Sequence, residues 1–204
     1  SILWRNDAEY LGISLKNIVI VDTTLNLPLA GEHNRRNATL VARAAEFLSL
    51  AKNDTVVMAL SDFPGTDRRF EKLGDNLYTD YGHHPKEIAA TLQLARELSD
   101  HVVLVYQPHQ NRRQTKIQKE YINQFESADD VYWLPTYLSR EDPDEPILTP
   151  LELIQNITNQ SAIHVAAFDD ELWNNIQQAR SEGKLVLCMG AGTIDSWVRK
   201  RTAL

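Results

Sequence analysis

Apolar residues follow an alternating strand and helix pattern, most regularly in the second half of the chain. Val102–Tyr106 and Leu185–Met189 are continuous apolar runs, typical of parallel strands buried on both faces. Shorter runs predict further strands at residues 77–81, 131–134 and 162–166. Helical spacing predicts helices at residues 85–98, 114–125, 149–157, 169–182 and 193–200. This alternation predicts an α/β fold: a Rossmann-like, mostly parallel sheet with helices on both faces.

The first part of the chain shows less of this alternation. Residues 18–21 predict a strand, and helical spacing predicts helices at residues 32–51 and 53–60. These elements are too few for a closed core, so we expect residues 1–61 to be the end of a domain that begins upstream. The turn-rich stretch at residues 62–67 predicts the boundary to a second domain over residues 62–204.

Composition narrows the classes of partner. Apolar residues make up 43% of the 204 residues, enough for a packed core. The net charge of −7 argues against nucleic acid or an anionic membrane surface as main partner. No apolar run approaches the roughly 20 residues that span a bilayer. Cys188 is the only cysteine, so an intrachain disulfide is impossible, and we expect a buried thiol and a cytoplasmic location.

The densest group of reactive side chains directly follows a predicted strand. It comprises Asp80, Tyr81, His83 and His84, and Pro85 then opens a helix. Ligands of open α/β sheets bind at the carboxyl ends of strands. A carboxylate there can hold ribose hydroxyls, and an imidazole can carry a proton near neutral pH. The alternative is that Asp80 and His84 only cap the helix.

A second group follows the next predicted strand and therefore lies at the same edge of the sheet. It comprises Gln107, His109, Arg112 and Arg113. Guanidinium groups bind carboxylate or phosphate bidentately, which favours an anion site. The alternative is that one of the two arginines is a solvated loop residue.

Two further pairs of residues each allow two interpretations. Arg68 and Arg69 follow the predicted linker, where they could clamp a phosphate or simply carry surface charge. Asn34 and Asn37 lie one helical turn apart, where their amides could contact a base edge or cap the helix.

Two other patterns predict no site. Residues 190–192, Gly-Ala-Gly, begin like a dinucleotide-binding fingerprint, but the third glycine is missing and Asp195 stands near its place. We therefore expect a tight turn. His83, His84 and His109 could form a zinc set, but adjacent histidines at a strand end point apart, so no metal site is predicted.

Taken in order, these motifs resemble those of the Mur ligases along nearly the whole chain. The matching stretches are residues 33–37, 63–71, 80–85, 107–109 and 190–192. The resemblance implies the end of a central ATPase domain followed by a complete Rossmann-like C-terminal domain. No G-x-x-x-x-G-K-[ST] phosphate loop occurs in the chain. The UDP-sugar domain, most of the ATPase domain and most of the magnesium ligands would then lie outside this chain. They would belong to missing domains that a longer protein supplies in cis.

The resemblance also implies roles for individual residues, with ATP and Mg²⁺ as cofactors. Arg69 would reach the γ-phosphate and Asp80 the ribose, while Asn34 and Asn37 would face the adenine. The pocket for the amino acid and the muramoyl carboxylate would be lined by Tyr81, His83, His109 and Arg113.

Of these residues, Arg69 and His83 are the implied catalytic pair. The carboxylate would be phosphorylated and then attacked by the amine. We expect this chain alone to be inactive, because it contains no phosphate loop.

Within the family, the motifs are most like those of the member that joins L-alanine to UDP-N-acetylmuramate in peptidoglycan synthesis. One departure stands out, since the family pattern Arg-Tyr-Ser-Arg-Thr is replaced at residues 110–114 by Gln-Asn-Arg-Arg-Gln. Gln110 thus replaces a cation. Two alternatives stay open: a recycling ligase for a whole tripeptide, in which Phe-Ala is expected in place of Tyr81-Gly82, and a non-catalytic scaffold.

Overall fold

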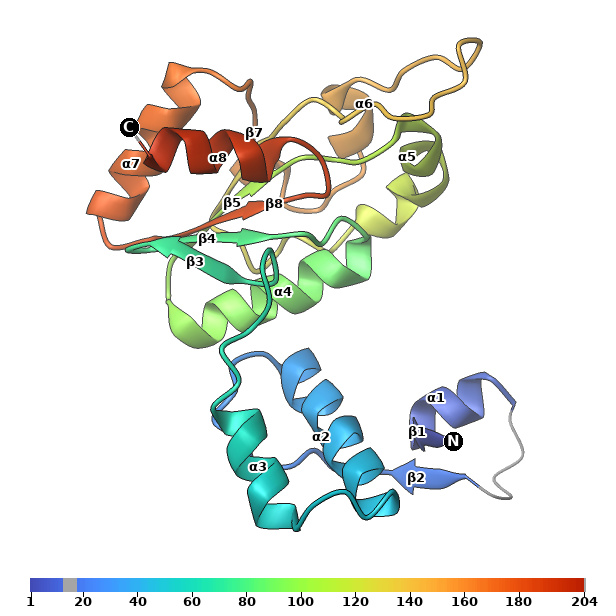
Figure 1. The fold of residues 1–204 in the computed structure, drawn as a ribbon. Helices are drawn as coiled ribbons and strands as arrows, with labels where there is room; N and C mark the ends of the chain where they lie inside the picture. Colours follow the sequence, from blue (N-terminus) through green and yellow to red (C-terminus); the bar gives the residue numbers. More distant parts are fainter. Residues whose placement is uncertain (13–17, 204) are drawn as a thin grey trace. The chain divides into compact units, whose positions relative to one another are not determined.

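The computed structural model describes residues 1–12 and 18–203, and the chain divides into two compact units, Ser1–Pro64 and Gly65–Leu204 (Figure 1). That the first unit is the remnant of an ATP-binding domain, with a boundary after residue 61, stays a prediction.

The first unit pairs two short parallel strands and adds three helices. Its strands are β1 (Ile2–Trp4) and β2 (Val19–Val21), and its helices are α1 (Arg5–Tyr10), α2 (Glu32–Phe47) and α3 (Asn53–Ser61). The sequence did not predict α1. The helix predicted to reach residue 51 ends at Phe47, because Ser49 adopts a left-handed backbone conformation with φ of 53°. Large apolar side chains such as Phe47 and Met58 remain exposed on this unit.

In the second unit, the described residues form a six-stranded sheet in the order β3-β4-β8-β5-β6-β7. The strands are β3 (Glu71–Gly74), β4 (Leu77–Asp80), β5 (Val102–Tyr106), β6 (Asp130–Trp133), β7 (Ile163–Val165) and β8 (Leu185–Met189). Every described pairing in this sheet is parallel except that of β3 with β4. The mostly parallel α/β fold is therefore confirmed, whereas the hairpin strand β3 was not predicted.

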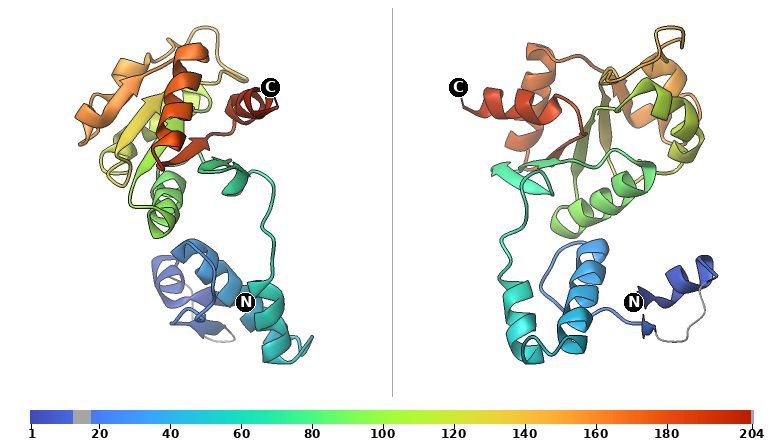
Figure 2. Two further views of the ribbon diagram at one scale, coloured as in Figure 1. Left: turned by 90° about the vertical axis from the view of Figure 1, so that its left-hand side faces the viewer. Right: turned by 45° about the vertical axis from the view of Figure 1, so that its right-hand side comes forward.

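Helices cover both faces of this sheet (Figures 1 and 2). One core cluster joins Leu104 and Tyr106 to residues of α4 (Pro85–Leu98), α5 (Asn111–Ile117) and α6 (Pro150–Ile154). A second cluster joins Val103 and Val105 to α7 (Asp170–Ser181) and α8 (Ile194–Thr202). Neighbouring residues of a strand point to opposite faces, so each cluster fills one side of the sheet.

Helix α5 differs from its predicted span of residues 114–125. It begins three residues earlier because the Glu141 carboxylate accepts the backbone amides of Asn111 (2.9 Å) and Arg112 (3.2 Å). It ends at Ile117 and continues as a 3₁₀ turn over Gln118–Tyr121. A cap from a segment 30 residues later leaves no local pattern, so the start of this helix could not be predicted.

The strand order creates a switch point in the middle of the sheet. Strand β8 lies between β4 and β5, yet the chain leaves β4 and β5 toward one face and leaves β8 toward the other. The loops beyond these three strands therefore diverge at their carboxyl ends. In open α/β sheets this is the position at which ligands bind.

Candidate functional site

Backbone hydrogen bonds hold the three central strand ends together. The amide of Gly190 donates to the Asp80 carbonyl at 3.0 Å, and the amide of Gln107 donates to the Met189 carbonyl at 2.9 Å. Gly190 has a φ of 154°, and a Cβ there would lie 2.7 Å from the Gln107 carbonyl oxygen. Only glycine fits at position 190, and the chain then bends at residues 191–193 before α8, where the sequence predicted a tight turn over residues 190–192.

Asp80 is buried, with 5% of its surface exposed, and its carboxylate ties two turns together. Its Oδ1 accepts the Gly82 amide at 2.7 Å, and its Oδ2 accepts the Phe70 amide at 2.8 Å. The predicted ribose contact stays a prediction.

Helix capping was considered for Asp80 and His84, and the structure shows it for His84. His84 is the N-cap of α4, and its Nδ1 lies 3.4 Å from the Lys86 amide. The Glu87 carboxylate completes the capping box by accepting the His84 amide at 3.0 Å. Two hydrogen bonds of Asp80 go to the amides of Phe70 and Gly82, while the capping box of α4 is formed by His84 and Glu87.

His83, His109, Arg113 and Tyr137 form a group that we call the histidine cluster. The two imidazole centroids lie 5.3 Å apart, and His109 stacks on Tyr137 at 5.5 Å with an interplanar angle of 15°. The Arg113 guanidinium contacts Nε2 of His83. Guanidinium can only donate, so Nε2 accepts, and the proton of a neutral His83 resides on Nδ1, which donates to the Tyr81 carbonyl at 3.2 Å.

Both histidines of this cluster favour the neutral form. Burial is the main cause that lowers the pKa of His83, and the positive charge of Arg113 adds to it. Burial likewise lowers the pKa of His109, followed by the charges of His83 and Arg113. Among the described residues, the buried Nδ1 of His109 has no hydrogen-bond partner. The cluster thus places the permanent positive charge of Arg113 near an imidazole nitrogen that has no hydrogen-bond partner among the described residues.

Tyr81, directly after β4, contacts the side chains of Arg68 and Arg69. Tyr81 is 36% exposed, and the guanidiniums of Arg68 and Arg69 lie 4.6 Å and 5.6 Å from its ring centroid. Arg69 itself is exposed. The structure therefore groups Arg69 with Tyr81, and His83 with His109 and Arg113, all in the second unit.

Asn34 and Asn37 belong to helix α2 of the first unit and form a separate group. The Asn34 amide donates to the Ala30 carbonyl at 2.9 Å, which ties the helix start to the preceding loop. Asn37 is exposed. The N-cap of α2 is Gly31, and the bond from Asn34 donates to a carbonyl, so it is not the helix cap that was considered for these amides. Adenine contact stays a prediction for both.

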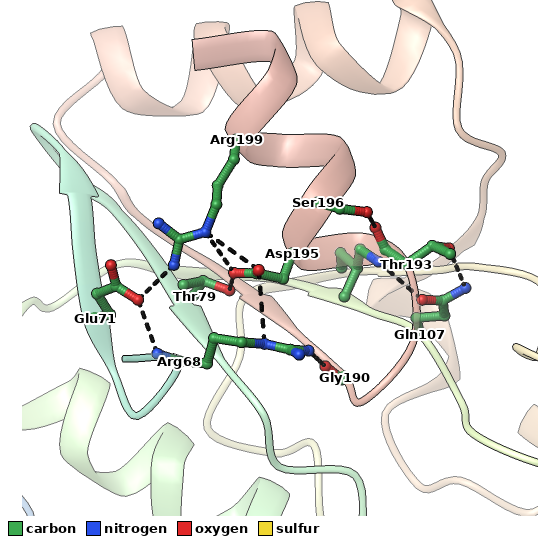
Figure 3. Close-up of polar contacts among 10 residues, drawn as sticks. Arg68, Glu71, Thr79, Gln107, Gly190, Thr193, Asp195, Ser196 and Arg199 are labelled. Atoms are coloured by element: carbon green, nitrogen blue, oxygen red, sulfur yellow. Dashed lines mark hydrogen bonds and ion pairs between the residues drawn. The ribbon is translucent and has the colours of Figure 1, made fainter. Parts of the chain in front are cut away.

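Sequence reasoning missed an ion-pair cluster formed by Arg68, Glu71, Asp195 and Arg199 (Figure 3). Arg199 donates to Glu71 at 2.5 Å and to both oxygens of Asp195 at 3.1 Å and 3.2 Å. The bond from Arg199 is the main cause that lowers the pKa of Glu71. Asp195 and Arg199 are four residues apart on α8, a spacing typical of an exposed helix face, so the sequence signal was weak.

Tyr137 was also missed, although a signal existed. It lies four residues beyond the end of β6, in the loop at the same edge of the sheet as His109. Its backbone pairs with that of His109, because the Gln110 amide donates to the Tyr137 carbonyl and the Tyr137 amide to the Pro108 carbonyl, both at 2.8 Å. The strand-end rule could have included it.

The described residues offer no metal site, no membrane-spanning helix and no reactive thiol. They contain no group of three or more His, Cys, Asp or Glu side chains suited to a metal ion. They also contain no helix with the length and apolar character needed to cross a bilayer. Cys188 is fully buried, as predicted, and burial raises the pKa of its thiol to about 12. Such a thiol is protonated and unreactive at neutral pH.

Known proteins share both the sequence and the fold. Residues 68–192 match the family model described as Mur ligase, glutamate ligase domain. Over 95% of its length the chain is 35% identical to the UDP-N-acetylmuramate–L-alanine ligase of Jannaschia sp. strain CCS1, covering 42% of that protein. It is 33% identical over its whole length to the enzyme of the same name from Dinoroseobacter shibae, covering 45% of it.

A solved structure agrees on the fold. The UDP-N-acetylmuramate-alanine ligase of Thermotoga maritima superposes with a TM-score of 0.59 at 22% identity, covering 87% of this chain and 38% of that one. The chain thus spans less than half the length of each of these three relatives.

Proposed function

The chain belongs to the Mur ligase family, and from this premise we propose that it is the C-terminal region of an ATP-dependent ligase that joins L-alanine to UDP-N-acetylmuramate. The observation that carries the proposal is the histidine cluster at the switch point of the sheet. It offers a cation and two neutral imidazoles where this fold binds ligands. The names of the relatives support the choice of substrates.

Arg113 is proposed to bind a substrate carboxylate. Its guanidinium contacts the neutral imidazole of His83. A carboxylate is a stronger partner, because it carries the opposite charge and can accept two parallel hydrogen bonds from one guanidinium. Substrate binding would therefore draw Arg113 away from His83 and release Nε2. The released Nε2 can accept the proton that the attacking amine loses as the amide bond forms.

Arg69 is proposed to meet the phosphoryl group. Its exposed guanidinium beside Tyr81 can neutralise the negative charge that builds on the transferring phosphoryl oxygens. Asp80 is proposed to hold the ribose, and Asn34 and Asn37 to face the adenine. ATP would phosphorylate the muramoyl carboxylate, and the amine would then displace the phosphate.

Magnesium and location complete the proposal. The described residues contain no group of three or more His, Cys, Asp or Glu side chains that could hold a metal ion. Any Mg²⁺ that accompanies ATP would be held by parts of the protein outside them. The cytoplasmic location inferred from the sequence stays a prediction.

The recycling alternative fits this chain less well. That alternative expects alanine at position 82, but a Cβ on Gly82 would clash with Cε of Met189 and lie 2.8 Å from Oδ1 of Asp80. Both side chains would have to shift. Gln110 stands where the family carries arginine, and its side chain makes a local contact. The side-chain amide of Gln110 donates to the Ser139 carbonyl at 3.3 Å.

The test uses the complete gene product that contains this chain. It would be incubated with ATP, magnesium and UDP-N-acetylmuramate, plus either L-alanine or the tripeptide, and the product identified by mass spectrometry. We expect the alanine product, with ADP formed in equal amount. Preference for the tripeptide would establish the recycling reaction, and no ATP binding in calorimetry would establish the scaffold.

A further inference from the structure

The turn that carries Arg69 has an unfavourable backbone. Arg68 and Phe70, on either side of it, have φ angles of 56° and 49°. Residues with a Cβ rarely adopt this left-handed region, and such a turn persists only where its surroundings hold it. We refer to residues 68–70 as the Arg69 turn.

Backbone hydrogen bonds account for part of that hold. The Arg69 amide donates to the Thr66 carbonyl at 3.1 Å, and the Tyr81 amide donates to the Arg68 carbonyl at 2.8 Å. Two carboxylates accept the remaining amides, because Phe70 donates to Asp80 and Arg68 donates to Glu71, each at 2.8 Å. Strand β4 and the residue after it therefore anchor one side of the turn.

Helix α8 anchors the other side through the ion-pair cluster (Figure 3). Arg199 holds the same Glu71 oxygen that accepts the Arg68 amide, at 2.5 Å. Asp195 binds Arg199, accepts the Thr79 hydroxyl at 3.1 Å and lies 3.6 Å from Nε of Arg68.

The Arg68 side chain closes the arrangement. Its Nη2 donates to the Gly190 carbonyl at 3.1 Å, so the turn is also tied to the loop after β8. Asp195 is only 13% exposed and Glu71 25%, so solvent screens this cluster less than it screens ordinary surface pairs. Both arginines and both acids thus converge on the backbone that flanks Arg69.

We propose that Asp195 and Arg199 are positioning residues for Arg69, so that helix α8 fixes the direction in which Arg69 meets a phosphoryl group. This inference rests on the proposed function. The Arg69 side chain is exposed, and the ring of Tyr81 lies beside its guanidinium, so its direction depends on the backbone that carries it. Misplacement of a catalytic group by about 1 Å can cost roughly 10²-fold in rate.

Activity of the complete protein gives the first test. Arg199→Met should lower kcat roughly 10- to 100-fold and leave KM for L-alanine and UDP-N-acetylmuramate nearly unchanged. Arg201→Met is the matched control, because Arg201 lies on the same helix and pairs with Asp170 at 2.6 Å, apart from the turn. The control should keep kcat within about twofold, and a kcat of Arg199→Met equal to that of the control would overturn the proposal.

A double-mutant cycle separates positioning from a general structural role. If Arg199 acts through Arg69, then Arg199→Met should cost less than about twofold once Arg69→Ala is present. An equal loss in both backgrounds would contradict the inference. Should Arg199→Met fail to fold, Asp195→Asn takes its place, because it keeps the size and an oxygen acceptor for Thr79.

A third measurement does not depend on activity. Hydrogen exchange of the Phe70 and Tyr81 amides in the complete protein should be faster in Arg199→Met than in Arg201→Met. If the complete protein forms no amide while this difference appears, the proposed function fails and the anchoring of the turn stands. If the complete protein ligates and the cycle is additive, the function stands and the positioning role fails.

Discussion

Two polar clusters flank the end of strand β4 and differ in how their charges are partnered. In the ion-pair cluster, Arg199 bridges Glu71 and Asp195, and the pKa of Glu71 is lowered. In the histidine cluster, a cation faces neutral imidazoles whose pKa values burial lowers, and among the described residues Nδ1 of His109 has no hydrogen-bond partner. The first cluster has used its charges to fix backbone, whereas the second retains capacity for an anion.

Asp80 connects the two clusters. One of its oxygens accepts an amide of the Arg69 turn, and the other accepts the amide of Gly82, next to His83. The positions of the proposed phosphate contact and of the proposed proton acceptor therefore depend on one buried carboxylate. The ion-pair cluster, whose charges are paired, thus supports the backbone, and the histidine cluster is left for the chemistry. Each of the following changes tests that division.

The largest effect is expected from Arg113→Met in the complete protein. It removes the cation proposed to bind the substrate carboxylate, and loss of a hydrogen bond between charged groups costs about 1.5–3 kcal/mol, roughly 10- to 150-fold in kcat/KM. Steady-state kinetics would measure it, with Arg112→Met, an exposed neighbour on the same helix, as control. Equal losses in both variants would contradict the assignment of Arg113 to the substrate.

Asp80→Asn should have the next largest effect, on stability. The asparagine amide nitrogen would face a backbone donor that Asp80 now accepts, and an unsatisfied buried donor costs about 1–3 kcal/mol. Urea unfolding of the 204-residue chain would measure the change in the free energy of unfolding. Asp75→Asn, in the exposed turn of the β3–β4 hairpin, is the control, and a loss no larger than its own would refute the linking role of Asp80.

The fold could be predicted wherever a local pattern determines the element. Strands β5 and β8 are continuous apolar runs, and helix α4 opens with proline, so the structure confirms all three with their predicted bounds. Strand β3 contains a single large apolar residue, Leu73, and exists because it pairs with β4. Helix α5 starts where a distant carboxylate caps it, and neither cause is visible in a window of neighbouring residues.

The candidate site likewise contains residues that the sequence could place and contacts that it could not predict. The strand-end rule placed Asp80, His83, His109 and Arg113 at one edge of the sheet, and the structure confirms that placement. Their roles toward substrates stay predictions. The partnership of Glu71 with Arg199 spans 128 residues and depends on the packing of α8, so no spacing could reveal it.

The third effect is on pH dependence and belongs to the histidine cluster. Burial lowers the folded-state pKa of His83 and His109 below the ordinary 6.5, so the unfolded chain binds protons more readily. Stability should therefore fall as the pH drops below about 6.5, until the lowered pKa values are reached. Urea midpoints would show it, and His83→Gln with His109→Gln should flatten the curve. A double variant with the unchanged slope would show that other groups cause it.

The smallest effect is expected in the ion-pair cluster and lies in a different pH window. The pKa of Glu71 lies below its ordinary 4.5, chiefly because of the bond from Arg199, so its contribution is present above pH 4.5 and is lost as the pH falls through the lowered value. Arg199→Met should make the stability curve less steep below pH 4.5 and leave the region near pH 6.5 unchanged. Partly exposed pairs are worth about 0–1 kcal/mol, which sets the size of the change. Arg201→Met controls for the loss of a charge on α8. A change near pH 6.5 in Arg199→Met would mean that the two clusters are coupled, against the separation of support from chemistry.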